Sequence, residues 1–147
     1  MKKTITVAGL LALGFLSIPT QAFAACTANT KMSVAQLTAL LPGKVVCARN
    51  GLEWKWQELH VGAPGATSGA LIDYKKGPND PVDPSKNVGN WQIAGNGNNA
   101  TVVYSYTAFG SAGPYSHTVH DNGNSTYSFC GGGPEVVATV QSGPACQ

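Results

Sequence analysis

Charged residues are scarce in this chain of 147 residues, where Asp, Glu, Lys and Arg together make up 11% of the sequence. Two of the nine basic residues, Lys2 and Lys3, lie in a leader-like segment, and without them basic and acidic residues balance. Beyond that segment the only adjacent basic pair is Lys75-Lys76. Nucleic-acid binding normally needs a basic stripe that neutralises phosphates, so we expect no nucleic-acid partner.

The common catalytic and metal-binding patterns are also missing. The chain has no GxSxG, no HExxH and no CxxC. His117 and His120 are three positions apart, which on a strand places them on opposite faces. The glycine-rich pieces at 95–97 and 131–133 are not followed by a helical pattern, so they indicate turns and not phosphate cradles. We therefore expect no catalysis, no metal site and no cofactor.

Long apolar runs are confined to the N-terminus. Met1-Lys2-Lys3 is basic, residues 5–18 are apolar and uncharged, and Ala22-Phe23-Ala24 is a small-x-small site. This pattern is typical of a secretion signal cleaved after Ala24. The apolar run is short for a membrane span, which needs about 20 residues. We expect residues 1–24 to be a signal peptide and residues 25–147 to form one exported domain, periplasmic or secreted, with no membrane span.

The chain has four cysteines, Cys26, Cys47, Cys130 and Cys146. An even number in an exported chain favours two disulfides, and three pairings are possible. We predict Cys26–Cys146, which would tie the termini together, and Cys47–Cys130, which would join the first and seventh strands of a curled sheet. Lipid acylation of Cys26 is the alternative, but it would leave an odd number of thiols. We therefore expect a monomer without a lipid anchor.

Turn-forming residues are plentiful, with 18 Gly and 9 Pro. One short helix is predicted, with Ser33 as its N-cap, apolar residues at 34, 37, 40 and 41, and Pro42-Gly43 as its end. The remainder separates into eight candidate strands. They lie at 44–49, 53–61, 70–75, 88–93, 101–107, 115–121, 126–130 and 135–141. Three X-Pro bonds make 76–87 a stiff connecting loop in this interpretation.

These elements predict an all-β fold with one short N-terminal helix. About eight antiparallel strands in a meander can close into a small barrel of lipocalin-like architecture, which removes exposed sheet edges. A β-sandwich is the alternative. The predicted domain is tied by its disulfides.

The most site-like pattern lies on the strand at 53–61. Side chains alternate between the two faces of a strand, so two indoles, a carboxylate and an imidazole share one face there. An aromatic floor with a few polar groups suits a small-ligand pocket, although the same residues could fill a barrel core. With two tyrosines of the strand at 101–107, the candidate ligand-binding residues are Trp54, Trp56, Glu58, His60, Tyr104 and Tyr106.

Two resemblances accompany these patterns. Gly89-Asn90-Trp91 resembles the G-x-W motif of lipocalins and avidins, which implies a Trp packed at one end of a closed barrel. A second set of motifs is similar to small exported proteobacterial proteins of unknown role, which implies an exported single domain and no particular activity. These motifs are Trp56-x-Glu58-x-His60, Asp73-Tyr74-Lys75, GPNDPVDP at 77–84, Val88-Gly89-x-Trp91 and Phe129-Cys130.

The functional hypothesis from the sequence is a small exported protein that binds an apolar or aromatic small molecule without catalysis. The alternative is a secreted protein-interaction module or inhibitor, with the loop at 76–87 as its contact surface. A hydrolase is a third possibility, and it would need a nucleophile and a base together in a cleft.

Overall fold

The computed structural model describes residues 26–50, 53–74, 85–108, 110, 112–131, 133–143 and 146, with the backbone only at 50, 53, 54 and 112. The predicted signal peptide and most of the predicted 76–87 loop lie outside these residues. A 3₁₀ turn (η1, Ala28–Thr30) and a helix (α1, Val34–Leu40) precede eight strands. The strands are β1 Lys44–Asn50, β2 Glu53–His60, β3 Ser68–Tyr74, β4 Ser85–Ala94, β5 Thr101–Tyr106, β6 Ala112–Asp121, β7 Thr126–Gly131 and β8 Val136–Ser142.

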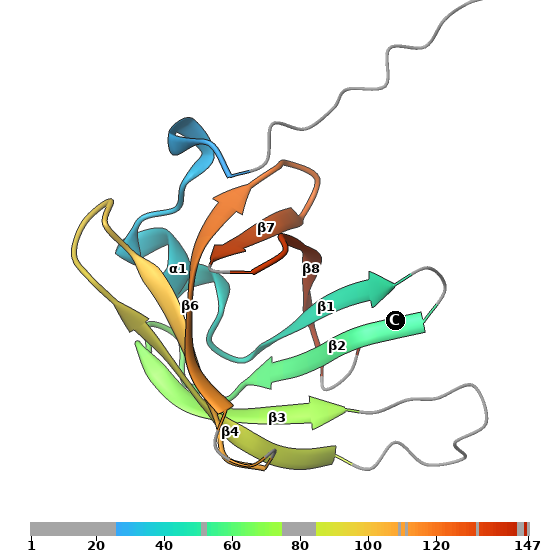
Figure 1. Ribbon diagram of the computed structural model, residues 1–147. Helices are drawn as coiled ribbons and strands as arrows, with labels where there is room; N and C mark the ends of the chain where they lie inside the picture. The colour runs from blue at the N-terminus through green and yellow to red at the C-terminus, as the bar shows by residue number, and fades with distance from the viewer. Residues whose placement is uncertain are drawn as a thin grey trace, which may run out of the picture.

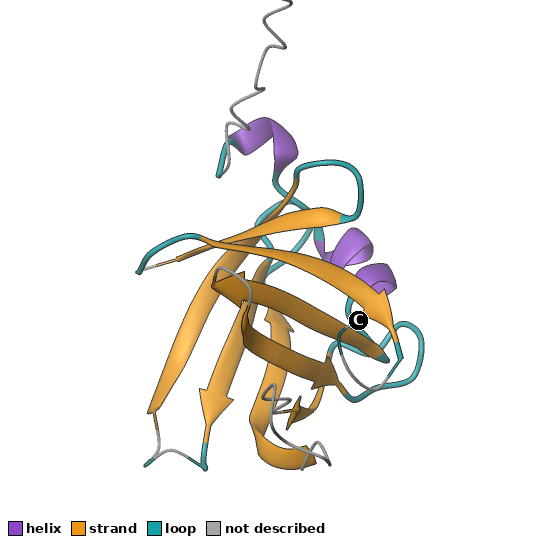
Figure 2. Cartoon of the chain, turned by 90° about the vertical axis from the view of Figure 1, so that its right-hand side faces the viewer, coloured by secondary structure: helices purple, strands orange, loops and turns teal. Residues whose placement is uncertain are grey.

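The strands form a closed antiparallel barrel in sequence order (Figures 1 and 2). Each strand pairs with the next, and β8 returns to pair with β1 from Lys44↔Ser142 to Ala48↔Ala138. This confirms the eight-stranded meander barrel and excludes the sandwich alternative. Closure pairs both edges of the sheet, which would otherwise present free N–H and C=O groups.

The helix begins where the sequence predicts. The Ser33 hydroxyl accepts a hydrogen bond from the Gln36 backbone N–H, and the Gln36 side chain accepts one from the Ser33 N–H. This reciprocal pair satisfies two N–H groups that the first turn cannot bond internally. Leu37 and Leu41 are fully buried, so one face of the helix packs on the barrel.

The helix closes one end of the barrel. Its first N–H, from Val34, donates to the Gly97 carbonyl in the β4–β5 turn (2.9 Å), and the Gly43 N–H donates to the His60 carbonyl at the end of β2 (2.8 Å). Trp91 is buried at this end, and its indole N–H donates to the Val61 carbonyl (3.2 Å). The closed end is therefore filled by helix and strand side chains together. The seven-residue α1 is the longest helix in the described part of the chain, where no helix is long and apolar enough to cross a membrane.

The predicted loop at 76–87 is too long. Ser85, Lys86 and Asn87 already belong to β4, where Asn87 pairs with Ile72 and Ser85 with Tyr74. A register shift between Leu71 and Ile72 accommodates this longer pairing. The strand boundary depends on that partner in β3, which local sequence does not reveal.

All four cysteines form disulfides, as predicted, but the predicted pairing is wrong. The bonds are Cys26–Cys130 and Cys47–Cys146. The barrel closes by hydrogen bonding of β1 to β8, which places β8 between β1 and β7. Cys47 and Cys130 thus lie two strands apart, roughly 10 Å at the usual strand spacing, beyond the reach of a disulfide. Two disulfides are typical of proteins from oxidising, exported environments.

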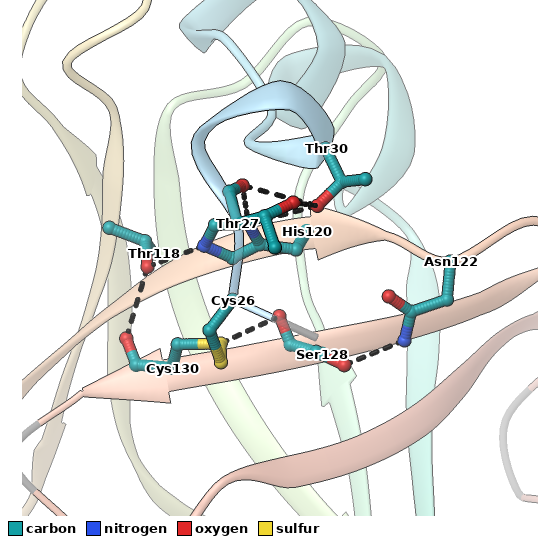
Figure 3. Close-up of a disulfide and its surroundings, with 8 residues drawn as sticks. All are labelled: Cys26, Thr27, Thr30, Thr118, His120, Asn122, Ser128 and Cys130. Carbon is teal, nitrogen blue, oxygen red and sulfur yellow. Dashed lines mark hydrogen bonds between the residues drawn. A yellow bond between two sulfur atoms is a disulfide. The ribbon is translucent and has the colours of Figure 1, made fainter. Parts of the chain in front are cut away.

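The N-terminal segment lies beside β6 (Figure 3). Lys31 forms a bridge with His120, and His120 Nδ1 donates to the Thr27 carbonyl (2.8 Å). The Thr118 hydroxyl bonds the Cys130 carbonyl on β7 (3.3 Å). These contacts bring Cys26 to Cys130, with Cα atoms 5.9 Å apart.

Cys47 forms its disulfide on the outer face of the barrel. Val46 and Ala48 belong to the main core, whereas Val45, Cys47 and Cys146 form a separate small buried cluster. The chain leaves β8 at Ser142, opposite Lys44 at the start of β1. Cys47 lies three positions along β1 from Lys44, so its bond to Cys146, four positions after Ser142, spans a short distance.

Candidate ligand-binding cavity

The end of the barrel opposite the helix contains a cavity of about 780 Å³. Its lining comes from the ends of β3, β5 and β7, the starts of β2, β6 and β8, and the middle of β1. Thus it lies where the odd-numbered strands end and the even-numbered strands begin. The lining residues are Val46, Lys55, Trp56, Glu58, Asp73, Tyr104, Tyr106, Pro114, Tyr115, Ser116, His117, Phe129, Gly133, Pro134 and Val136.

A row of tyrosines runs from the base of this cavity to its rim. The Tyr104 and Tyr106 rings are stacked, with centroids 6.4 Å apart, and the Tyr106 and Tyr115 rings are tilted at 6.0 Å. Tyr104 is buried, Tyr106 is half-buried and Tyr115 is 48% exposed. The row therefore offers a continuous aromatic wall of increasing exposure.

Glu58 is the buried carboxyl group of the cavity. The Tyr106 hydroxyl lies 2.9 Å and 3.1 Å from its two carboxyl oxygens. Asp73 is directly opposite Glu58 in the β2–β3 register. Burial raises the pKa of Glu58 from 4.5 to about 7; the Tyr106 hydrogen bond opposes this rise and the charge of Asp73 adds to it. Glu58 therefore titrates near neutral pH.

His60 lies beneath the cavity and not on its wall. It is fully buried, with Nδ1 3.1 Å from the Glu58 backbone carbonyl and Nε2 2.9 Å from the Tyr104 hydroxyl. A carbonyl only accepts, so Nδ1 carries the hydrogen and the Tyr104 hydroxyl donates to Nε2. Burial lowers the pKa of His60 from 6.5 to about 4, and the ring packs against Trp91 with centroids 5.3 Å apart.

The side chains of Glu58 and His60 do not approach each other near the barrel opening. Instead, His60 contacts only the backbone of Glu58, and the Glu58 carboxyl group bonds Tyr106. The i, i+2 spacing places both residues on the inner face, but at different depths, so one lines the cavity and the other belongs to the core.

Strand alternation fails at the start of β2. Ala48 pairs with Trp56 and Arg49 pairs with Trp54, so Lys55 is an extra residue in β2. Such a bulge lets adjacent side chains share a face, and both Lys55 and Trp56 line the cavity. Strict alternation would place Lys55 on the face opposite to Trp56. The Lys55 ammonium group lies 5.3 Å from the centroid of a Trp56 ring, and the side chain of Trp54 lies outside the described part of the structure.

Four of the six predicted ligand-binding residues line the cavity: Trp56, Glu58, Tyr104 and Tyr106. The sequence interpretation did not select the lining residues of β3 and β6 to β8. Among them His117 stands out, because its Nδ1 atom is buried without a hydrogen-bond partner among the described residues. Burial lowers the pKa of His117. The shared strand face of Tyr115 and His117 was a usable signal, but only the register of β5 with β6 places Tyr115 opposite Tyr104.

The described residues contain no group of three His, Cys, Asp or Glu that could hold a metal ion. A scan against protein-family models, a search of curated proteins and a search of solved structures found no match to this chain. The resemblances drawn from the sequence motifs stay predictions. The functional argument therefore rests on the barrel and its cavity.

Proposed function

We propose that this protein binds a small, largely apolar or aromatic molecule in the cavity of the barrel, without catalysing its conversion. The observation that carries this proposal is the cavity of about 780 Å³ with its row of aromatic rings. Ligand pockets typically enclose roughly 300–1,000 Å³, with apolar and aromatic walls and a few polar groups that fix orientation. Glu58 is such a group.

The test is a ligand screen with a variant whose cavity is filled. Trp56 lines the cavity, so a ligand in contact with it should change the tryptophan fluorescence of the purified protein. Val136 lines the same space and is 9% exposed, so Val136→Trp should fill part of it and weaken binding at least tenfold. The proposal fails if no compound in a broad aromatic panel binds, or if Val136→Trp binds every ligand as the natural protein does.

The alternative, a protein-interaction module, depends on the predicted loop at 76–87. Residues 75–84 lie outside the described structure, so nothing described favours this function over ligand binding. A partner captured from envelope or host extract, with no small-molecule binding, would support it.

We also propose that the protein is exported, periplasmic or secreted, and monomeric, with residues 1–24 removed. The Cys26–Cys130 bond supports the absence of a lipid anchor, because acylation would convert the Cys26 sulfur into a thioether that cannot form a disulfide. The intact mass of the exported protein should correspond to a chain that begins near Ala25. A diacylglycerol adduct on Cys26 would contradict this proposal.

A further inference from the structure

The polar contacts inside the cavity indicate which ligands it takes. Glu58 is 8% exposed, and within the described structure the Tyr106 hydroxyl is the one donor to its carboxyl group. An ionised carboxylate can accept about four hydrogen bonds. The Tyr106 hydroxyl supplies one hydrogen for both carboxyl oxygens, so most of these hydrogen bonds are not made. Each missing hydrogen bond is costly in a buried position, because water does not replace it there.

The charges that face the cavity have an uneven distribution. The titratable side chains on its lining are Lys55, Glu58, Asp73, Tyr104, Tyr106, Tyr115 and His117. Glu58 and Asp73 are neighbours on paired strands. Lys55 is exposed at the start of β2 and lies beside the Trp56 ring. Because burial favours the neutral form of His117, the described lining of the cavity places no cation at the depth of Glu58.

Neighbouring side chains also favour a cationic ligand over an anionic one. The Tyr104 hydroxyl donates to His60, and the Tyr106 hydroxyl donates to Glu58. Neither hydrogen is free for an anionic ligand. The faces of tyrosine and tryptophan rings also attract cations, and Trp56, Tyr104 and Tyr106 line the same space as Glu58.

We infer that the cavity selects amines: an aromatic or alkyl body packs against the tyrosine row, and a protonated amino group donates to the carboxylate of Glu58. This inference rests on the proposed ligand-binding function and names its ligand class. An ammonium group supplies the donors that the buried carboxylate lacks and cancels its charge.

Binding of an amine should then depend on pH. Aliphatic amines stay protonated well above neutral pH, as the lysine side chain does. The carboxyl group of Glu58, with its pKa of about 7, is ionised at pH 8 and neutral at pH 5. We expect amine affinity to fall as the pH decreases through 7.

Three probes with the same ring and different polar ends test the inference by calorimetry: 2-(1-naphthyl)ethylamine, 2-(1-naphthyl)ethanol and 1-naphthaleneacetic acid. At pH 8 the amine should bind at least tenfold more tightly than the alcohol, and the acid most weakly. Glu58→Gln keeps the size of the side chain and an oxygen that accepts from Tyr106. It should weaken amine binding by about 10- to 100-fold, as expected for loss of a charge-assisted hydrogen bond, and leave alcohol binding almost unchanged.

The outcomes separate this inference from the proposed function. If the alcohol or the acid binds as tightly as the amine, and Val136→Trp weakens that binding, the cavity binds ligands but the amine preference is wrong. If Glu58→Gln, shown to be folded by circular dichroism, binds the amine as the natural protein does, the role of Glu58 is wrong. If none of the probes or a wider aromatic panel binds, both proposals fail.

Discussion

At the scale of single residues, Glu58 and His60 make the protein stability depend on pH in opposite directions. The raised pKa of Glu58 stabilises the fold below pH 4.5, and this contribution is lost as the pH rises through 7. The lowered pKa of His60 stabilises the fold above pH 6.5, and this contribution is lost as the pH falls through 4. Between pH 4.5 and 6.5 the two effects oppose each other.

Replacing Glu58 should remove one of these two pH dependences of stability and leave the one caused by His60. Glu58→Gln removes the buried charge, so the variant should be more stable than the natural protein at pH 7 and above, by about 3 kcal/mol. The difference should vanish near pH 4.5, where the natural side chain is protonated. Urea unfolding between pH 4 and 8 measures this. Glu135→Gln makes the same change on an exposed side chain; an equal gain in that control would contradict the argument.

Trp56 contacts both the core and the cavity, so its replacement tests which of the two roles dominates. The side chain is half-buried, packs against the core and lines the cavity. Truncation of a fully packed Trp costs roughly 3–5 kcal/mol, so Trp56→Ala should cost less, about 1–3 kcal/mol, and should abolish ligand binding. Chemical unfolding measures the loss of stability, and calorimetry measures the loss of ligand binding. A larger loss of stability with unchanged ligand binding would show that Trp56 is a core residue.

At the scale of elements, α1 is a short helix whose stability depends on its first turn and its buried face. Seven residues are too few for an isolated helix to persist in water. The cap at Ser33, the Val34 bond to the Gly97 carbonyl, and the burial of Leu37 hold it on the barrel. Because α1 closes the end opposite the cavity, changes in it should alter stability without altering the ligand-binding wall.

Ser33→Ala tests the role of the cap. The change removes the hydroxyl that accepts from the Gln36 N–H, and it should cost about 1 kcal/mol. Thr38→Ala is the matched control, because the exposed Thr38 hydroxyl bonds only the Ala35 carbonyl three residues earlier in the helix. It should change stability by less than about 0.5 kcal/mol. Thermal unfolding distinguishes the two variants, and equal effects would contradict the capping argument.

At the scale of the whole molecule, closure and cross-linking are separate features. The β1–β8 hydrogen bonds close the barrel, whereas the disulfides attach the two terminal segments to its outer surface. The bonds connect residues 104 and 99 positions apart. Loops of that length carry a large closure entropy in the unfolded chain.

Removing one bond should therefore destabilise the barrel without opening it. The double variant Cys47→Ser/Cys146→Ser leaves no unpaired thiol and should lose about 4–5 kcal/mol by the chain-entropy estimate. Its far-UV circular dichroism should stay that of a β protein. Non-reducing peptide mapping of the natural protein should recover Cys26 with Cys130 and Cys47 with Cys146. A variant that loses its β signal in buffer would show that the bond is required for closure.

The sequence by itself determined the features that depend on neighbouring residues. Alternating side chains and turn residues predicted all eight strands within a few residues, because side-chain alternation and turn chemistry act over a few positions. Ser33 and Pro42-Gly43 predicted the two ends of the helix for the same reason. The even number of cysteines, together with the signal-like N-terminal pattern, predicted two disulfides, but not which residues they join.

Only the tertiary structure decided what depends on distant residues. The disulfide pairing follows from β8 lying between β1 and β7, and from the N-terminal segment lying along β6. The bulge at Lys55 follows from the pairing of β2 with β1. Glu58 and His60 share one strand face. The positions of α1, Trp91 and the tyrosine row decide which of the two residues lines the cavity and which is buried in the core. Closing the barrel sets those positions, because closure brings strands together that are far apart in the chain.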